Sequence, residues 1–173
     1  MGSSVPSQLS PRAREIVAVA RELLEAEGRQ ALSMRRIAER LGIRAPSLYK
    51  HVSDKQALEA ALISDGFEEL AAAFQEAGDL TQIARAYRAF AAAHPHLYRL
   101  MTAGPLPRER LPRGVEERAA APLVAALGGD EDAARAAWAF AHGMTILELD
   151  GRFPPHADVD AAWRTGLAAF ARR

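Results

Sequence analysis

The sequence predicts an all-α protein, in which a small three-helix unit at the N-terminus is joined by a long fourth helix to a larger helical unit. Three observations support this fold class. Apolar residues make up 49% of the 173 residues and many of them are alanine, the residue with the highest helix propensity. Valine and isoleucine, which favour strands, are few. Apolar positions also recur at helical spacing between residues that typically begin and end helices.

The first helix is predicted over residues 11–28. Ser10 suits an N-cap, and Pro11 fits the first turn because the N–H that proline lacks would have no partner there. Gly28 suits a C-terminal stop. The apolar side chains that share one face of this helix are Ile16, Val17, Ala20, Leu23 and Leu24.

Two short helices follow, with a turn at Gly42 between them. Ser33 caps the first of them, which ends near Arg40. Pro46 lies where the second can begin, and this helix ends near His51. The side chains that we expect to point inward are Ile37, Ala38, Leu41, Leu48 and Val52.

The sequence Ser53-Asp54-Lys55-Gln56 has the form of a capping box and opens a fourth helix that runs to about Ala77. Later helices are predicted over residues 79–93, 96–103, 115–128, 130–149 and 158–172, with a proline-containing loop from Gly104 to Gly114. The predicted domains are a disordered tail at 1–9, an N-terminal domain at 10–52 with the start of the linking helix at 53–60, and a second domain at 61–173.

Charge is balanced over the whole chain but differs between its two ends. Residues 1–55 hold ten Lys and Arg against six Asp and Glu, a balance of +4, and residues 56–173 hold twelve against sixteen, a balance of −4. A basic front suggests that this part alone meets a polyanion. An accident of composition explains the charges equally well, so charge leaves both readings open.

The sequence lacks the features that are typical of several classes of function. The chain has no cysteine, so it cannot form a disulfide or a thiolate metal site, which fits a reducing cytoplasm. No apolar run reaches the roughly 18 residues of a membrane span, and the N-terminus does not have the pattern of a signal peptide. No hydrolase, metalloprotease, P-loop or dinucleotide motif is present. We therefore expect a cytoplasmic protein that is not an enzyme and has no catalytic residue, cofactor or metal.

Two short helices joined by a tight turn and braced by a longer helix form a helix-turn-helix, whose second helix fits the major groove of DNA. Arg44 and Lys50 can donate to guanine or to phosphate, and Ser47 can bind a base edge or phosphate. The residues suited to phosphate contact are Ser33, Arg35, Tyr49 and Lys55. The alternative is that all of these are solvated surface residues of a small helical bundle.

The segment "LSMRRIAERLGIRAPSLYKHVSDKQAL", residues 32–58, resembles the N-terminal domain of the TetR family of bacterial transcriptional repressors. Its most specific element is Leu-Tyr-x-His at 48–51, with Lys55 and Leu58 after it. The resemblance implies a homodimer, a palindromic operator and release by a small effector. It assigns base reading to Arg44, Ala45, Pro46 and Ser47, and phosphate contact to Ser33, Tyr49, His51 and Lys55. Ala45 departs from this pattern because it cannot hydrogen-bond a base, so it would contact a thymine methyl and direct readout would fall on Arg44, Ser47 and Lys50.

The stretches "WAFAHGMTILELDGRF" (138–153) and "AHPHLYRLM" (93–101) resemble the WHG-type C-terminal domain of some TetR-family members, in which a tryptophan is followed by His-Gly. Trp138 and His142 share one helix face. Gly143 at a helix centre costs about 1 kcal/mol against alanine, which close approach of another helix would explain. If each subunit supplies two helices, the dimer interface is a four-helix bundle. The predicted interface residues are Trp138, Gly143, Leu147, Trp163, Leu167 and Phe170. The alternative is that these residues are core.

An effector pocket is predicted from aromatic and amphipathic side chains on neighbouring helices. These residues are Phe67, Phe74, Tyr87, Phe90, His94, Tyr98, Met101 and His142. Aromatic residues at helical spacing are also typical of an ordinary core. The leading hypothesis is a ligand-responsive repressor released from DNA by a largely apolar effector, and the alternative is an effector-independent DNA-binding or architectural protein.

Overall fold

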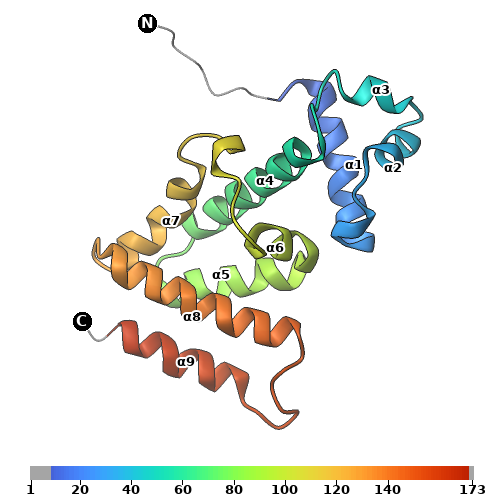
Figure 1. The fold of residues 1–173 in the computed structure, drawn as a ribbon. Coiled ribbons are helices and arrows are strands. Elements are labelled where there is room, and N and C mark those ends of the chain that lie inside the picture. Colours follow the sequence, from blue (N-terminus) through green and yellow to red (C-terminus); the bar gives the residue numbers. More distant parts are fainter. Residues whose placement is uncertain (1–8, 172–173) are drawn as a thin grey trace, which may run out of the picture. The chain divides into compact units, whose positions relative to one another are not determined.

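The computed structural model describes residues 9–171, which form nine α-helices and two short 3-10 helices and contain no strand (Figure 1). The predicted all-α fold is confirmed. Residues 1–8 of the predicted tail lie outside the described part of the chain. The helices group into two compact units, one comprising residues up to Phe67 together with His94–Val115, and the other Glu68–Ala93 together with the chain from Glu116 onward.

The first unit contains the three N-terminal helices and the start of the fourth. Its elements are α1 (Pro11–Glu27), η1 (Arg29–Ala31), α2 (Met34–Arg40), α3 (Ala45–Leu48), the N-terminal part of α4 (Lys55–Gln75), α6 (Pro95–Thr102) and η2 (Arg108–Arg110). The predicted caps of α1 and α2 are present. Ser10 Oγ accepts the Ala13 N–H at 3.1 Å, and Ser33 Oγ accepts the Arg36 N–H at 3.2 Å.

The cap of α4 differs from the prediction by one residue. Asp54, not Ser53, caps this helix, because Asp54 Oδ1 accepts the Ala57 N–H at 2.7 Å. A carboxylate at this position satisfies a free N–H and also faces the positive end of the helix dipole. Arg110 of η2 donates to both Asp54 oxygens at 3.1 Å. These contacts lower the pKa of Asp54, with the backbone hydrogen bond from Ala57 as the largest cause and Arg110 as a further one.

A continuous apolar core holds the first unit together. Its fully buried side chains include Ile16, Leu23, Leu24, Leu32, Ile37, Leu48, Leu58, Leu62 and Leu97. Helix α6 packs on α1 and also approaches α4 closely at Gly66. A Cβ added to Gly66 would lie 3.1 Å from Leu97 Cδ2 and closer still to the Met101 sulfur. Glycine therefore allows α4 and α6 to approach within the first unit.

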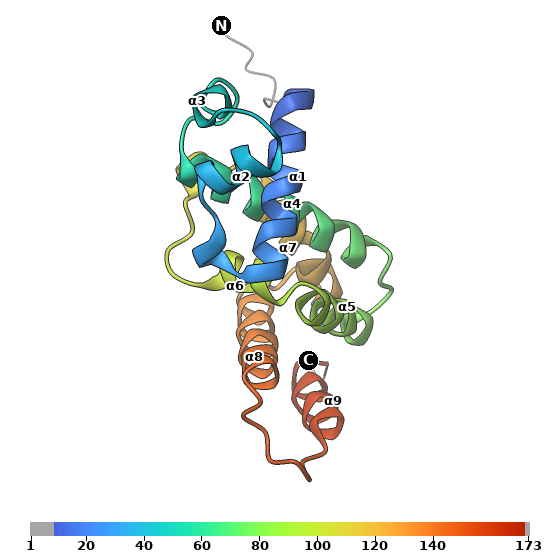
Figure 2. The same cartoon turned by 90° about the vertical axis from the view of Figure 1, so that its right-hand side faces the viewer.

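The second unit contains the C-terminal part of α4 and the helices α5 (Leu80–Ala93), α7 (Val115–Ala126), α8 (Glu131–Leu149) and α9 (Val159–Phe170). Helices α8 and α9 lie side by side and run antiparallel (Figures 1 and 2), and both contact α5. No helix in residues 9–171 is both long enough and apolar enough to span a membrane.

One arginine joins three helices of this unit, α5, α8 and α9. Arg88 on α5 donates from Nε to Glu148 Oε2 on α8 at 2.8 Å and from Nη1 to Asp160 Oδ1 on α9 at 2.5 Å. The indole Nε1–H of Trp163 donates to the other Glu148 oxygen at 2.5 Å. Glu148 therefore has partners on both neighbouring helices, which fixes α5, α8 and α9 together.

Candidate nucleic-acid interface

The turn between α2 and α3 depends on a glycine. Gly42 has φ +64°, a left-handed conformation that other residues rarely adopt. In the described chain, a Cβ there would meet no atom within 4 Å, so the backbone conformation and not crowding requires glycine. The Ile43 N–H returns to the Ala38 carbonyl at 3.0 Å, which closes the end of α2.

Helix α3 is shorter than predicted, because it ends at Leu48 and the chain continues in turns to His51. The N–H groups of His51 and Val52 both donate to the Leu48 carbonyl at 2.9 Å. Leu48 is 0% exposed and Val52 is also buried, as the sequence predicts. These two side chains anchor the segment on the core of the first unit.

The opposite side of this segment faces solvent. Ala45 is half-buried, and the other residues predicted to contact DNA from residues 44–51 are exposed: Arg44, Pro46, Ser47, Tyr49, Lys50 and His51. Tyr49 is 52% exposed, although a large aromatic side chain is usually at least partly covered. The exposed segment from Arg44 to His51, called the exposed edge below, therefore presents hydrogen-bond donors to solvent, as a DNA-reading helix requires.

Three predicted phosphate contacts lie at the starts of α2 and α4. Ser33 Oγ accepts a backbone N–H, which leaves its hydroxyl proton to donate to phosphate. The Arg35 side chain is 83% exposed, and its Nε lies 3.6 Å from Glu39. Lys55 is the first residue of α4, and its side chain is 46% exposed.

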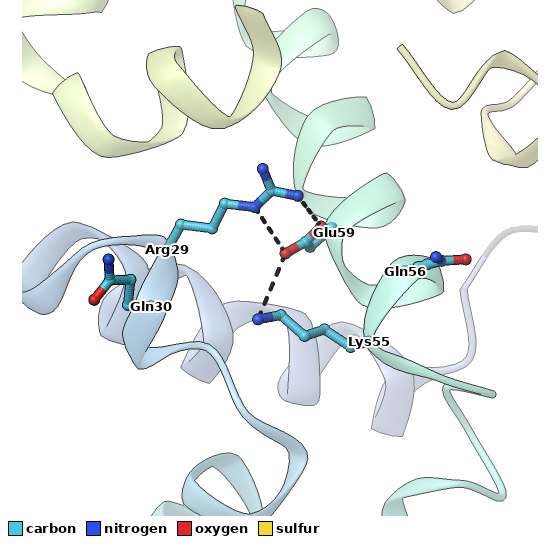
Figure 3. Close-up of a pocket in the computed structure, with 5 residues that line it drawn as sticks. All are labelled: Arg29, Gln30, Lys55, Gln56 and Glu59. Atoms are coloured by element: carbon cyan, nitrogen blue, oxygen red, sulfur yellow. Dashed lines mark hydrogen bonds and ion pairs between the residues drawn. The ribbon is translucent and has the colours of Figure 1, made fainter. Parts of the chain in front are cut away.

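Lys55 belongs to a charged cluster that sequence reasoning did not find (Figure 3). An open pocket of about 550 Å³ is lined by Arg29, Gln30, Lys55, Gln56 and Glu59. Glu59 is buried, with only 8% of its surface exposed. Arg29 donates from Nε to Oε1 at 3.1 Å and from Nη2 to Oε2 at 2.8 Å. The Lys55 ammonium lies 3.8 Å from the same Oε1.

The Arg29–Glu59 pair is strong enough to affect ionisation. Its hydrogen bonds, and then its Coulomb attraction, raise the pKa of Arg29. The two residues are 30 positions apart in sequence, and neither the spacing nor a motif relates them. Only the packing of η1 beside α4 brings them together.

The predicted dimer residues on α8 have open space beside them, although Trp138 and Leu147, nine residues apart, point to opposite sides of the helix. Trp138 is 50% exposed, Leu147 is also exposed, and Gly143 has no atom of the described chain within 4 Å of where a Cβ would be. The rings of Trp138 and His142 stack, with centroids 5.9 Å apart and an interplanar angle of 24°. Burial lowers the pKa of His142.

The predicted dimer residues on α9 pack inside the second unit. Trp163 and Leu167 are buried, and Phe170 is partly covered. The Phe140 ring of α8 lies against Trp163 at 5.6 Å and against Phe170 at 6.1 Å between centroids. A Cβ on Gly166 would lie 2.8 Å from Phe140 Cε1 and closer to two other ring atoms. Within the chain, Gly166 is therefore the glycine that lets α8 and α9 approach, a role that the sequence did not indicate.

The eight predicted effector-pocket residues are distributed over both units. Phe67, His94, Tyr98 and Met101 belong to the first unit, and Phe74, Tyr87, Phe90 and His142 to the second. Phe67, His94 and His142 are partly covered and the other five are buried. None of the eight lines the pocket at Glu59. Within residues 9–171, no group of three or more His, Cys, Asp or Glu is arranged to hold a metal ion.

Comparison with known proteins identifies both parts of the chain. Residues 16–62 match the model of bacterial regulatory proteins of the tetR family, and residues 80–170 match the model of the tetracyclin repressor-like C-terminal domain. The C-terminal match does not specify the WHG type, which stays a prediction.

Individual relatives agree with these matches. The chain is 31% identical over 161 residues to the uncharacterised HTH-type transcriptional regulator Rv0681 of Mycobacterium tuberculosis, covering 84% of this chain and 73% of that protein. It is 47% identical over 47 residues to the class C tetracycline repressor protein of Escherichia coli, covering 27% of this chain and 22% of that protein. The crystal structure of the regulatory protein SCO4313 superimposes with a TM-score of 0.76 at 27% identity, covering 92% of this chain and 94% of that one.

Both family models, a relative matched over most of its length and a shared fold point to the same group. The chain is a transcriptional regulator that belongs to the TetR family.

Proposed function

We propose that this protein is a ligand-responsive repressor that binds a palindromic operator as a homodimer and is released by a small, largely apolar effector. The observation that carries the proposal is the exposed edge from Arg44 to His51, held on a buried anchor at Leu48. DNA as the partner also implies that the protein acts in the bacterial cytoplasm.

In this proposal, the exposed edge reads DNA from the major groove. Arg44, Ser47 and Lys50 supply direct readout, and Ala45 and Pro46 make apolar contact with the bases. Phosphate contacts set the position of the helix on the duplex and supply much of the affinity. These contacts come from Ser33, Arg35, Tyr49, His51 and Lys55.

Dimerisation uses the exposed residues of α8. Trp138 and Leu147 are exposed large apolar side chains of that helix on opposite sides of it, and Gly143, on the same side as Leu147, leaves room for a partner helix. Trp163 and Phe170 pack against Phe140 of α8, and with the buried Leu167 they support this helix from inside the unit. A twofold dimer presents two recognition helices, which must lie about 34–36 Å apart to enter successive major grooves.

Release by an effector requires two conformers with different affinities for DNA. Helix α4 is the element suited to link them, since it begins at the DNA-binding edge with Lys55 and ends in the second unit with Gln75. An effector held by the predicted pocket residues would favour the conformer in which the two recognition helices no longer match the DNA. Couplings of this kind are typically about 1–3 kcal/mol, or roughly 5- to 150-fold in affinity.

The proposal is tested by selecting bound fragments from genomic DNA and measuring affinity for the recovered sequence. Arg44→Ala should lower that affinity and relax the preference at one operator position, because a base contact is lost. Arg135→Ala is the matched control, since it removes an exposed arginine from α8 in the second unit. If Arg44→Ala leaves the sequence preference unaltered while the fold is intact, the assignment of this edge to base reading is wrong.

The effector-independent alternative makes a different prediction. A protein without an effector site should show no change in thermal stability or operator affinity with any member of a panel of small apolar compounds. A compound that raises the melting temperature and releases the operator would support the ligand-responsive repressor. Binding of the operator by a monomer with full affinity would refute the homodimer.

A further inference from the structure

The cluster around Glu59 places one carboxylate between two cations. Glu59 lies one helical turn after Lys55, the spacing at which an acidic and a basic residue on a helix attract each other. Such a pair would neutralise Lys55, the residue to which the proposed function assigns a phosphate contact. The carboxylate is nevertheless occupied mainly by Arg29, which comes from η1 (Figure 3).

The distances show that Arg29 binds Glu59 more closely than Lys55 does. Arg29 makes two hydrogen bonds, at 3.1 and 2.8 Å, one to each oxygen of Glu59. The Lys55 ammonium is 3.8 Å from the nearer oxygen, which is beyond hydrogen-bonding distance. A bidentate arginine–carboxylate pair is also the stronger geometry, because two parallel N–H groups match the two oxygens. Lys55 therefore keeps its three N–H donors available, and its side chain is 46% exposed.

We infer that Arg29 is a positioning residue for DNA binding: by hydrogen-bonding both oxygens of Glu59, it keeps that carboxylate from hydrogen-bonding Lys55 and leaves the Lys55 N–H donors to meet a DNA phosphate. This inference rests on the proposed phosphate contact of Lys55. Arg29 itself makes no contact with DNA in this scheme.

The burial of Glu59 makes the competition strong. With Arg29 in place its side chain is 11% exposed, so little of the carboxylate is in contact with water. A buried charge without a partner is costly, and Lys55 already lies 3.8 Å away. Loss of Arg29 would therefore draw Lys55 onto Glu59. DNA would then have to break this pair before it gained the phosphate contact.

The experiment measures DNA affinity against salt concentration, because each phosphate contact contributes about 0.9 to the slope of log K against log salt. The probe is a fluorescent random-sequence duplex, since phosphate contacts do not depend on sequence. The full-length variants are R29Q, K55M and R29Q/K55M. We expect K55M to lower the slope by up to about 0.9 and the affinity several-fold. R29Q should move both values toward those of K55M, and the double variant should match K55M alone.

A second pair of variants, E59Q and R29Q/E59Q, removes the negative charge of Glu59, for which Arg29 and Lys55 compete. E59Q keeps the shape of the side chain but not its charge, so R29Q/E59Q has no buried charge to stabilise and should fold even if R29Q does not. We expect E59Q and R29Q/E59Q to have the same salt slope, because Arg29 has no further role once Glu59 is neutral. Thermal unfolding of every variant establishes that the protein is folded at the temperature of the assay.

The outcomes separate this inference from the proposed function. If K55M binds the duplex like the unaltered protein, Lys55 has no phosphate contact, and both the proposed role and the inference are wrong. If K55M is weakened but R29Q lowers affinity equally with and without Lys55, Arg29 acts through its own charge or its own contact. That result, or a lower slope in R29Q/E59Q than in E59Q, would overturn the inference and leave the proposed function intact.

Discussion

Two glycines in the C-terminal helices look equivalent in sequence, but substitution by alanine should affect them in opposite directions. Gly143 and Gly166 both lie inside helices, α8 and α9 respectively. A Cβ on Gly143 meets no atom of the described chain within 4 Å. A Cβ on Gly166 would overlap the Phe140 ring, with Cε1 at 2.8 Å and two other ring atoms closer.

The magnitudes follow from two competing effects. Replacing glycine by alanine inside a helix stabilises it by about 1 kcal/mol, because glycine loses more backbone entropy on folding. Gly143→Ala should therefore stabilise the single chain by about this amount. At Gly166 the same gain opposes overpacking, which typically costs about 1–3 kcal/mol. The Phe140 ring cannot move aside freely, since it packs against Trp163 and Phe170. Gly166→Ala should therefore be neutral to destabilising by about 2 kcal/mol.

Urea unfolding at several protein concentrations separates stability from association, because a dimer becomes more stable as its concentration rises. We expect Gly143→Ala to stabilise the chain at high dilution and to weaken dimerisation in analytical ultracentrifugation, since the methyl group would occupy space for the partner helix. Gly166→Ala should be no more stable than the parent at any concentration. If Gly166→Ala were more stable than the parent by the full helix gain, the close approach of α8 and α9 would be refuted. If Gly143→Ala left the dimer unaffected, Gly143 would not lie in the interface.

Three further predictions address the core, the interface and pH. Leu48→Ala should lower the free energy of unfolding by about 2–5 kcal/mol in urea titrations, because Leu48 is fully buried; a loss below 1 kcal/mol would mean that it is no anchor. Trp138→Glu should give monomers in light scattering with the fold retained, and a surviving dimer would exclude this face of α8. Burial lowers the pKa of His142, so the folded state favours its neutral form. The stability of the folded state that depends on this neutral form is present above the unfolded pKa of about 6.5 and is lost as the pH falls. His142→Gln should therefore lose less stability than the parent between neutral and mildly acidic pH, and equal losses would contradict the assignment.

Local chemistry made the helices predictable. Ser10 and Ser33 cap α1 and α2 as the sequence indicates, because a capping side chain acts on a backbone N–H only a few residues away. The one displaced cap follows the same physics. Ser53 and Asp54 are neighbours and both are good caps, and the helix begins at Lys55, so the residue directly before it makes the bond.

Contacts between distant residues could not be predicted in this way. Close approach of a partner helix at Gly143 stays a prediction. Within the chain, α8 and α9 approach at Gly166, because the position of Phe140 on the neighbouring helix decides which glycine is needed. Arg29 and Glu59 give no sequence signal, since a charged residue near a helix end is usually solvated. Their pairing depends on how η1 lies against α4.

The length of α3 limits how the DNA-binding edge can be held. Four residues, Ala45–Leu48, are too few for a helix to be stable alone, because the cost of forming the first turn is not recovered. The exposed donors therefore keep their positions only through Leu48 and Val52 in the core and through the turn at Gly42. An effector that acted by melting α3 would have to disturb that shared core, which also stabilises α1 and the start of α4. A change in the spacing of two intact DNA-binding units requires no such loss, so we expect hydrogen exchange of the Leu48 and Val52 amides to stay slow when an effector releases the operator.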